Sequence, residues 1–129
     1  MAKIERFLVE GQHEPVSHYC HAVRCGDRLW ISGTVGIASD GSVPEDTVDQ
    51  FRVAMDNLDT VLRTAGGKPE DIVKVTVFLT DINDRQRINP LRQAYFGPHR
   101  PASTLVEISA LVAPTLKVEI EAEAILDHE

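Results

Sequence analysis

The side chains best suited to binding a metal or forming a disulfide lie close together near the start of the chain. Cys20 and Cys25 lie in a segment with strand-like composition, which also holds His18 and His21. In an extended strand, residues five apart lie on opposite faces and ~16 Å apart, whereas a disulfide needs Cα atoms within ~7 Å. An odd separation splits the two histidines across the two faces in the same way. We therefore expect neither a disulfide nor a metal site here.

A second group of ionisable side chains lies near the C-terminal end. Glu119, Glu121 and Glu123 alternate with apolar residues in strict period two, so the three carboxylates share one face of a predicted strand. A carboxylate can act as a general base or orient a water molecule. Taken alone, however, three alternating carboxylates are more typical of a solvated sheet face.

Charge and composition narrow the range of partners. Thirteen Lys and Arg against twenty Asp and Glu give a net charge of −7, whereas nucleic-acid binders carry a basic face. The densest basic group (Arg85, Arg87 and Arg92) lies in one helix-like stretch and is interpreted as a solvated helix face. No signal peptide and no apolar run of membrane-spanning length is visible. We therefore expect a cytoplasmic protein without nucleic-acid or membrane partners.

The elements that must position these residues fit one domain, 1–129, since domains typically run to ~100–150 residues. A hairpin with its turn at Gly26-Asp27 is predicted over 18–33. An amphipathic helix follows from 47 to 65, with Thr47 and Gln50 as a capping box.

In the second half of the chain, a predicted strand is again followed by a predicted helix. A strand rich in β-branched residues is predicted over 72–79, and a helix over 81–95. Pro90 should cap or kink that helix and leave Asn89 at an irregular backbone position. Strands at 103–109 and 116–124 complete the order β-β-α-β-α-β-β. That order indicates an α+β fold with two helices packed on one face of a mixed β-sheet.

From about Tyr19 to Ala124 the chain resembles the RidA/YjgF (Rid) family. The resemblance is carried by Leu29-Trp-Ile-Ser-Gly33, Asp71-Ile-Val-Lys-Val-Thr-Val-Phe78, Asp81-Ile-Asn-Asp84, Arg100-Pro-Ala-Ser-Thr-Leu-Val-Glu107 and Lys117-Val-Glu-Ile-Glu-Ala122. The pairing of Pro-Ala-x-x-x-Val-Glu with a later Val-Glu-Ile-Glu-Ala is specific. The resemblance implies a chorismate-mutase-like (RidA/YjgF-like) fold, and a homotrimer that binds small-molecule ligands in clefts between subunits.

The resemblance also implies an activity. The best-known members hydrolyse reactive 2-imino or 2-enamino acids to 2-oxo acids and ammonia, and no cofactor or metal is implied. A glutamate that positions the attacking water falls at Glu119. Residues that line the pocket fall at Tyr19, Ser32 and Asn89.

Two residues of the family's motif are replaced in this chain. Ser103 stands where the family has the arginine that binds the substrate carboxylate, and Leu105 stands where it has a cysteine. A guanidinium offers a carboxylate two charge-assisted hydrogen bonds, and losing one charged hydrogen bond costs ~1.5–3 kcal/mol. We therefore expect a member of an arginine-less subgroup that fails as a general 2-imino acid deaminase. Arg100 is the nearest candidate for a substitute cation, the alternative being a solvated loop arginine.

Each predicted pocket residue also has a structural interpretation: Tyr19 as an ordinary interface aromatic, Ser32 as a turn residue, and Asn89 as a partner of local backbone groups. The leading hypothesis is a cofactor-independent, deaminase-type hydrolase. Its imine or enamine substrate would lack a simple 2-carboxylate or hold it differently. One alternative is a non-catalytic trimer that binds a metabolite. A ribonuclease is a third, and the net charge speaks against it.

Overall fold

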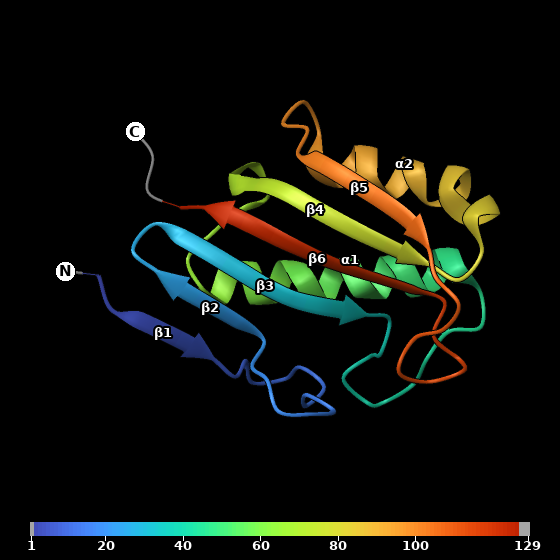
Figure 1. The fold of residues 1–129 in the computed structure, drawn as a ribbon, viewed down its shortest axis with the longest axis horizontal. Helices are drawn as coiled ribbons and strands as arrows, with labels where there is room; N and C mark the ends of the chain where they lie inside the picture. Colours follow the sequence, from blue (N-terminus) through green and yellow to red (C-terminus); the bar gives the residue numbers. More distant parts are fainter. Residues whose placement is uncertain (1, 127–129) are drawn as a thin grey trace.

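Six strands form one mixed sheet in the computed structural model, which describes residues 2–126 (Figure 1). Their order across the sheet is β1-β2-β3-β6-β4-β5. Only β4 and β5, joined through a helix, run parallel; the other neighbouring pairs are antiparallel. The strands are β1 (Ile4–Phe7), β2 (Ala22–Cys25), β3 (Arg28–Val35), β4 (Ile72–Leu79), β5 (Ala102–Glu107) and β6 (Val118–Ile125).

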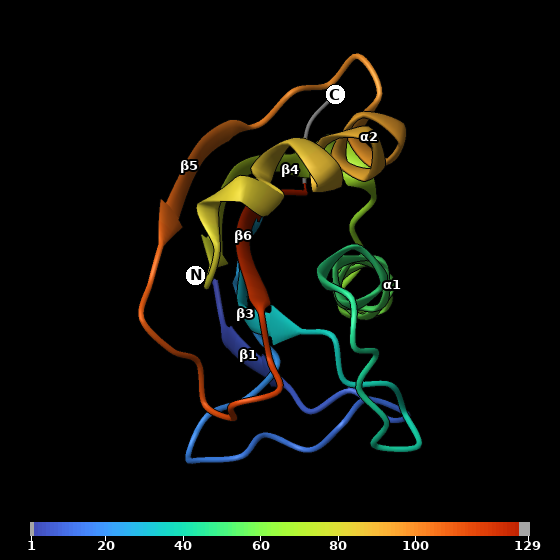
Figure 2. The same ribbon diagram turned by 90° about the vertical axis from the view of Figure 1, so that its right-hand side faces the viewer.

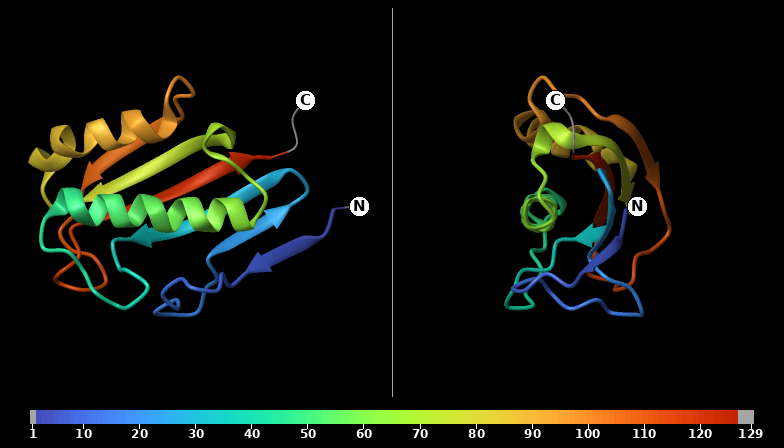
Figure 3. Two further views of the ribbon diagram at one scale, coloured as in Figure 1. Left: turned by 180° about the vertical axis from the view of Figure 1, so that it is seen from behind. Right: turned by 90° about the vertical axis from the view of Figure 1, so that its left-hand side faces the viewer.

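Both α-helices of the described residues lie on the same face of the sheet (Figures 2 and 3). These helices are α1 (Thr47–Thr64) and α2 (Arg85–Phe96), with short 3-10 turns at Pro69–Asp71 and Ile82–Asp84. The apolar side of α1 is buried against the sheet; Phe51, Leu58, Val75, Val77 and Ile120 are fully buried there. The predicted α+β architecture, with two helices on one face of a mixed sheet, is confirmed. No helix of residues 2–126 is long and apolar enough to cross a membrane.

The opposite face of the sheet carries the alternating carboxylates. In β6 the apolar residues are buried under the helices, while Glu121 and Glu123 are exposed and Glu119 is partly buried. Trp30 pairs with Glu123 across β3 and β6 and is 40 % exposed. This face therefore meets no helix, as the period-two pattern predicts.

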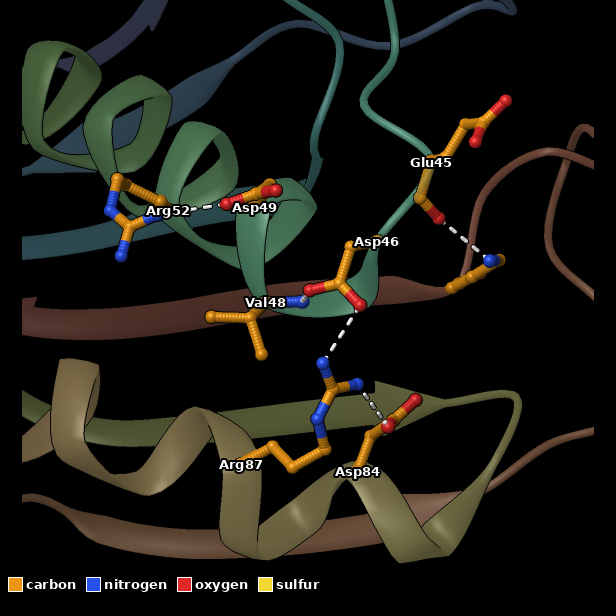
Figure 4. Close-up of polar contacts among 8 residues, drawn as sticks. Glu45, Asp46, Val48, Asp49, Arg52, Asp84 and Arg87 are labelled. Atoms are coloured by element: carbon orange, nitrogen blue, oxygen red, sulfur yellow. Dashed lines mark hydrogen bonds and ion pairs between the residues drawn. The ribbon is translucent and has the colours of Figure 1, made fainter.

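The start of α1 differs from the sequence prediction. Asp46 is the N-cap and accepts a hydrogen bond from the Val48 N–H (3.1 Å). Thr47 is buried in the first turn, and the Gln50 side chain bonds elsewhere, so the predicted capping box is wrong. Arg87 of α2 donates to Asp46 and to Asp84, each at 2.8 Å, and links α2 to the start of α1 (Figure 4).

Helix α2 is regular through Asn89 and Pro90, so the expected irregularity at Asn89 is wrong. The proline ring fixes φ near its helical value, and the missing N–H leaves one carbonyl without its helical donor. Gln86, whose carbonyl that is, lies at an exposed position where water can reach it. Strand β1, which has three exposed residues out of four, was not predicted.

Candidate functional site

A β-bulge interrupts β3 where it faces β6. The register between the two strands shifts between Ile31 and Thr34, which places Ser32 and Gly33 in the bulge. The Ser32 hydroxyl donates to the Cys20 carbonyl (2.6 Å), and the Ser32 N–H donates to the His21 carbonyl (3.0 Å). Ser32 therefore fastens the segment that carries Tyr19 to the end of the hairpin. A bulge of this kind commonly re-aims side chains beside a functional site.

Glu119 lies beside this bulge, opposite Val35 in the strand register. A side chain at Gly33 would collide with it: a Cβ there would lie 2.8 Å from the Glu119 carboxyl carbon. Partial burial raises the pKa of the Glu119 carboxyl, and the nearby charge of Glu121 raises it further. A carboxylate with a raised pKa is a stronger base near neutral pH.

The pocket at the bulge contains three of the seven predicted site residues. Tyr19, Ser32 and Glu119 line it together with Gly33 and the loop 12–16. The His21 ring holds that loop in place, since its Nδ1 accepts from the Val9 N–H (2.8 Å) and its Nε2 lies 3.0 Å from the His13 carbonyl. Because Nδ1 accepts, the proton is on Nε2, which donates to His13.

The other four predicted site residues lie in or beside the cleft between α2 and β5. Asn89 from the helix and Ser103 and Leu105 from the strand line a second pocket, and Arg100 lies on an adjoining surface with Asn89 and Ser103. Arg100 is exposed and has no hydrogen bond or ion pair within residues 2–126. The bulge pocket therefore contains none of Asn89, Ser103, Leu105 and Arg100, and the pocket between α2 and β5 contains none of Tyr19, Ser32 and Glu119.

Arg92 also lines the second pocket and was not among the residues predicted there. Its guanidinium donates to the Ser103 hydroxyl (2.8 Å), and burial lowers its pKa. Arg92 is therefore partly buried, and not as fully solvated as a helix-face arginine would be. The signal was its spacing: Arg92 follows Asn89 by three residues and so lies on the same face of α2.

No metal centre is evident in the described part of the chain. No three side chains of His, Cys, Asp or Glu among residues 2–126 are placed to hold a metal ion. Cys20 and Cys25 are free thiols, and Cys20 donates to the Ala22 carbonyl (3.3 Å). Besides Glu119 and the hydroxyls of Tyr19 and Ser32, the polar side chains that line the bulge pocket are Gln12, His13, Glu14, His21, Thr34 and Asn57.

The helix-covered mixed sheet defines a chorismate-mutase-like α+β protein, with a carboxylate-containing pocket at its strand bulge. A family model described as endoribonuclease L-PSP matches residues 10–126, so the chain belongs to that family, the RidA/YjgF family.

Individual relatives agree over nearly the whole chain. A RutC family protein (PH0854) of Pyrococcus horikoshii is 36% identical over 122 residues, covering 93% of this chain and 96% of the relative. A 2-iminobutanoate/2-iminopropanoate deaminase of Escherichia coli is 36% identical over 114 residues, covering 85% and 88%. The crystal structure of Escherichia coli TdcF with bound serine has a TM-score of 0.86 at 29% identity, covering 94% and 98%.

Proposed function

We propose that this protein hydrolyses a reactive imine or enamine to a carbonyl compound and ammonia. The observation that carries the proposal is the partly buried Glu119 carboxyl, with its raised pKa, beside Ser32 and Gly33 in the bulge pocket. The relative named as a 2-iminobutanoate/2-iminopropanoate deaminase supports this reaction class. The TdcF structure with bound serine supports a small-molecule ligand.

The reaction needs one base and no cofactor. Glu119, as the carboxylate, accepts a proton from a water molecule while the water oxygen attacks the C=N carbon. Glu119 returns that proton to the nitrogen, giving a tetrahedral carbinolamine. The carbinolamine hydroxyl then loses its proton, the amino nitrogen gains one, and the C–N bond breaks with its electron pair on nitrogen, so that ammonia leaves and the C–O bond becomes the carbonyl. The net reaction adds one water molecule and releases one ammonia.

We further propose that the complete site forms between subunits of a homotrimer. The bulge pocket and the α2–β5 pocket are separate on one subunit, and no helix of residues 2–126 covers the sheet face that carries Trp30 and the carboxylates (Figure 2). Packing three copies around these open faces would set the bulge of one subunit against the α2–β5 pocket of its neighbour.

Ammonia release from imines generated in situ tests the proposal. The wild-type protein should accelerate release in proportion to its concentration, and Glu119→Gln should lower the rate by ~10²-fold or more, since a positioned base contributes that much. Glu70→Gln, an exposed carboxylate in the turn before β4 and outside both pockets, is the control and should retain the wild-type rate. Release no faster than without protein, across a panel of imines, would favour the non-catalytic binding protein.

The same preparations should be incubated with RNA, because the description of the family model names an endoribonuclease. With a net charge of −7, no cleavage is expected. Cleavage abolished by Glu119→Gln would contradict the proposed reaction.

A further inference from the structure

Arg92 combines partial burial with the lack of a carboxylate partner in the described part of the chain, whereas Arg6, Arg28, Arg85 and Arg100 are exposed. Arg52, Arg63 and Arg87 each pair with aspartates, and Arg24 donates to two backbone carbonyls. Arg92 is partly buried, yet its one hydrogen bond within residues 2–126 goes to the neutral Ser103 hydroxyl. A guanidinium stays charged under these conditions. Its partial burial therefore carries a desolvation cost that no carboxylate of the described residues offsets.

The surroundings of Arg92 are positive. The pocket between α2 and β5 and the adjoining surface are lined by Arg85, Arg92 and Arg100, and by no acidic residue of the described chain. In a chain with seven more acidic than basic residues, this local excess of positive charge is unusual. Such a group attracts an anion and lowers the free energy of binding one.

We infer that Arg92 is the anion-binding group of this cleft and that the ligand it holds carries a carboxylate. Ser103, whose side chain is small, lines the same pocket as Arg92. Arg92 reaches the same place from α2, with its Nη2 at 2.8 Å from the Ser103 hydroxyl. The guanidinium fork presents two parallel N–H donors, which match a carboxylate.

This inference rests on the proposed function in taking the cleft as the substrate site, and it names the substrate class. The substrate carries a carboxylate that Arg92 binds, contrary to the sequence-based expectation of a substrate without a simple 2-carboxylate. In this chain the guanidinium that binds the carboxylate comes from α2, whereas the family motif has its arginine on the strand, at the position of Ser103.

The test measures binding without turnover. Dissociation constants for 2-oxobutanoate and for its neutral amide, 2-oxobutanamide, are determined for the wild type and for Arg92→Gln by NMR titration. Arg92→Gln should weaken 2-oxobutanoate binding at least tenfold, equivalent to ~1.4 kcal/mol, and leave the amide unchanged. Arg52→Gln, an exposed arginine of α1, is the matched control and should bind both ligands as the wild type does. Equal 2-oxobutanoate binding by Arg92→Gln and wild type would overturn the inference.

Two further variants separate Arg92 from its neighbours. Exchanging the two residues, Arg92→Ser with Ser103→Arg, returns the guanidinium to the strand and should recover most of the 2-oxobutanoate affinity lost in Arg92→Gln. A folded exchange variant that binds no better than Arg92→Gln would contradict a shared ligand position. Arg100→Gln should weaken binding less than Arg92→Gln, and a larger effect there would overturn the inference in favour of the candidate predicted from the sequence.

Failure of this inference is distinguishable from failure of the proposed function. If the wild type releases no ammonia from any imine but binds 2-oxobutanoate through Arg92, the reaction is wrong and the anion site stands. If Arg92→Gln hydrolyses 2-imino acids with unchanged KM and kcat, the anion site is wrong and the reaction stands.

Discussion

Gly33 leaves the space that the Glu119 carboxyl group occupies. The two residues lie on neighbouring strands, and a Cβ added at Gly33 would stand 2.8 Å from the Glu119 carboxyl carbon. Real Cβ atoms do not approach other atoms so closely. The bulge in β3 and the position of the acid are therefore one structural feature: the glycine is needed because the carboxyl group lies there.

Gly33→Ala should impair activity far more than stability. The atoms that a methyl group would meet belong to the end of a flexible side chain, so the Glu119 carboxyl group can move away at little cost. A carboxylate displaced by about 1 Å is a poor base for a water that must be held in place, and ~10²-fold is the expected loss in rate. Ammonia release and thermal unfolding, measured on one preparation, check both parts.

Gly36→Ala is the matched comparison. A Cβ at Gly36 would stand 2.8 Å from the Gln50 Cα, which is backbone of α1 and cannot move aside by rotation. This variant should lose ~1–3 kcal/mol of unfolding free energy. A Gly33→Ala protein as unstable as Gly36→Ala would show that the glycine serves packing and not the acid.

The raised pKa of Glu119 predicts a pH dependence with a definite sign. Burial and the charge of Glu121 raise this pKa, so the rate should fall as pH is lowered through the raised value, because the base is the deprotonated form. Glu121→Gln removes one of the two causes and should move this limb of the pH–rate profile to lower pH. If the acidic limb of the pH–rate profile does not move in Glu121→Gln, a group other than Glu119 controls the rate in that pH range.

The same shift has a consequence for stability. A carboxyl group whose pKa is higher in the folded than in the unfolded state stabilises the fold less as pH rises through the folded value. Glu119→Gln should therefore unfold at a higher temperature than the wild type at neutral pH. The difference should vanish below the ordinary carboxyl pKa of ~4.3. Equal unfolding temperatures at every pH would contradict the burial of this carboxyl group.

Gln50 should be the costliest polar side chain to remove. It is fully buried, donates to the Pro44 and Thr115 carbonyls (each 2.8 Å), and accepts from the Lys117 N–H (2.8 Å). Gln50→Met leaves three backbone groups without partners, and ~3 kcal/mol is the expected loss, since each unsatisfied group costs ~1–3 kcal/mol. Urea unfolding at fixed protein concentration measures it.

The exposed Gln86 provides the control for that measurement. Gln86→Met places the same new side chain on the open side of α2 and should change the unfolding free energy by less than ~0.5 kcal/mol. If the two methionine variants were equally stable, the hydrogen bonds of Gln50 to Pro44 and to the segment that leads into β6 would not stabilise the fold.

Most of the architecture was predictable because its signals are periodic. The alternation in β6 and the β-branched residues of β4 give both strands nearly their observed bounds. The capping box failed because the Gln50 carboxamide is needed by the segment before β6, 65 and 67 residues further along the chain. No local pattern contains such a requirement.

The candidate site was predictable only in part, and for a similar reason. The resemblance pointed to Tyr19, Ser32 and Glu119, which the fold brings into one pocket. It could not indicate Arg92, because the family motif has its arginine on the strand, at the position of Ser103. The contact between Arg92 and Ser103 depends on how α2 lies across β5, which is a property of the packed helix.

Mixing two defective subunits tests where the complete site lies. In a homotrimer whose sites form between subunits, Glu119 comes from one subunit and Arg92 from its neighbour. Glu119→Gln and Arg92→Gln proteins, each weak alone, should therefore regain activity when unfolded together and refolded as a mixture. Every mixed trimer then has one junction at which both residues are intact, and an equal mixture should reach about a quarter of the wild-type rate. The refolded mixture should have a mass near three times the 14.3 kDa of one chain in light scattering. A mixture no more active than its parents would place both residues in one subunit's site, and a mass of one chain would exclude the trimer.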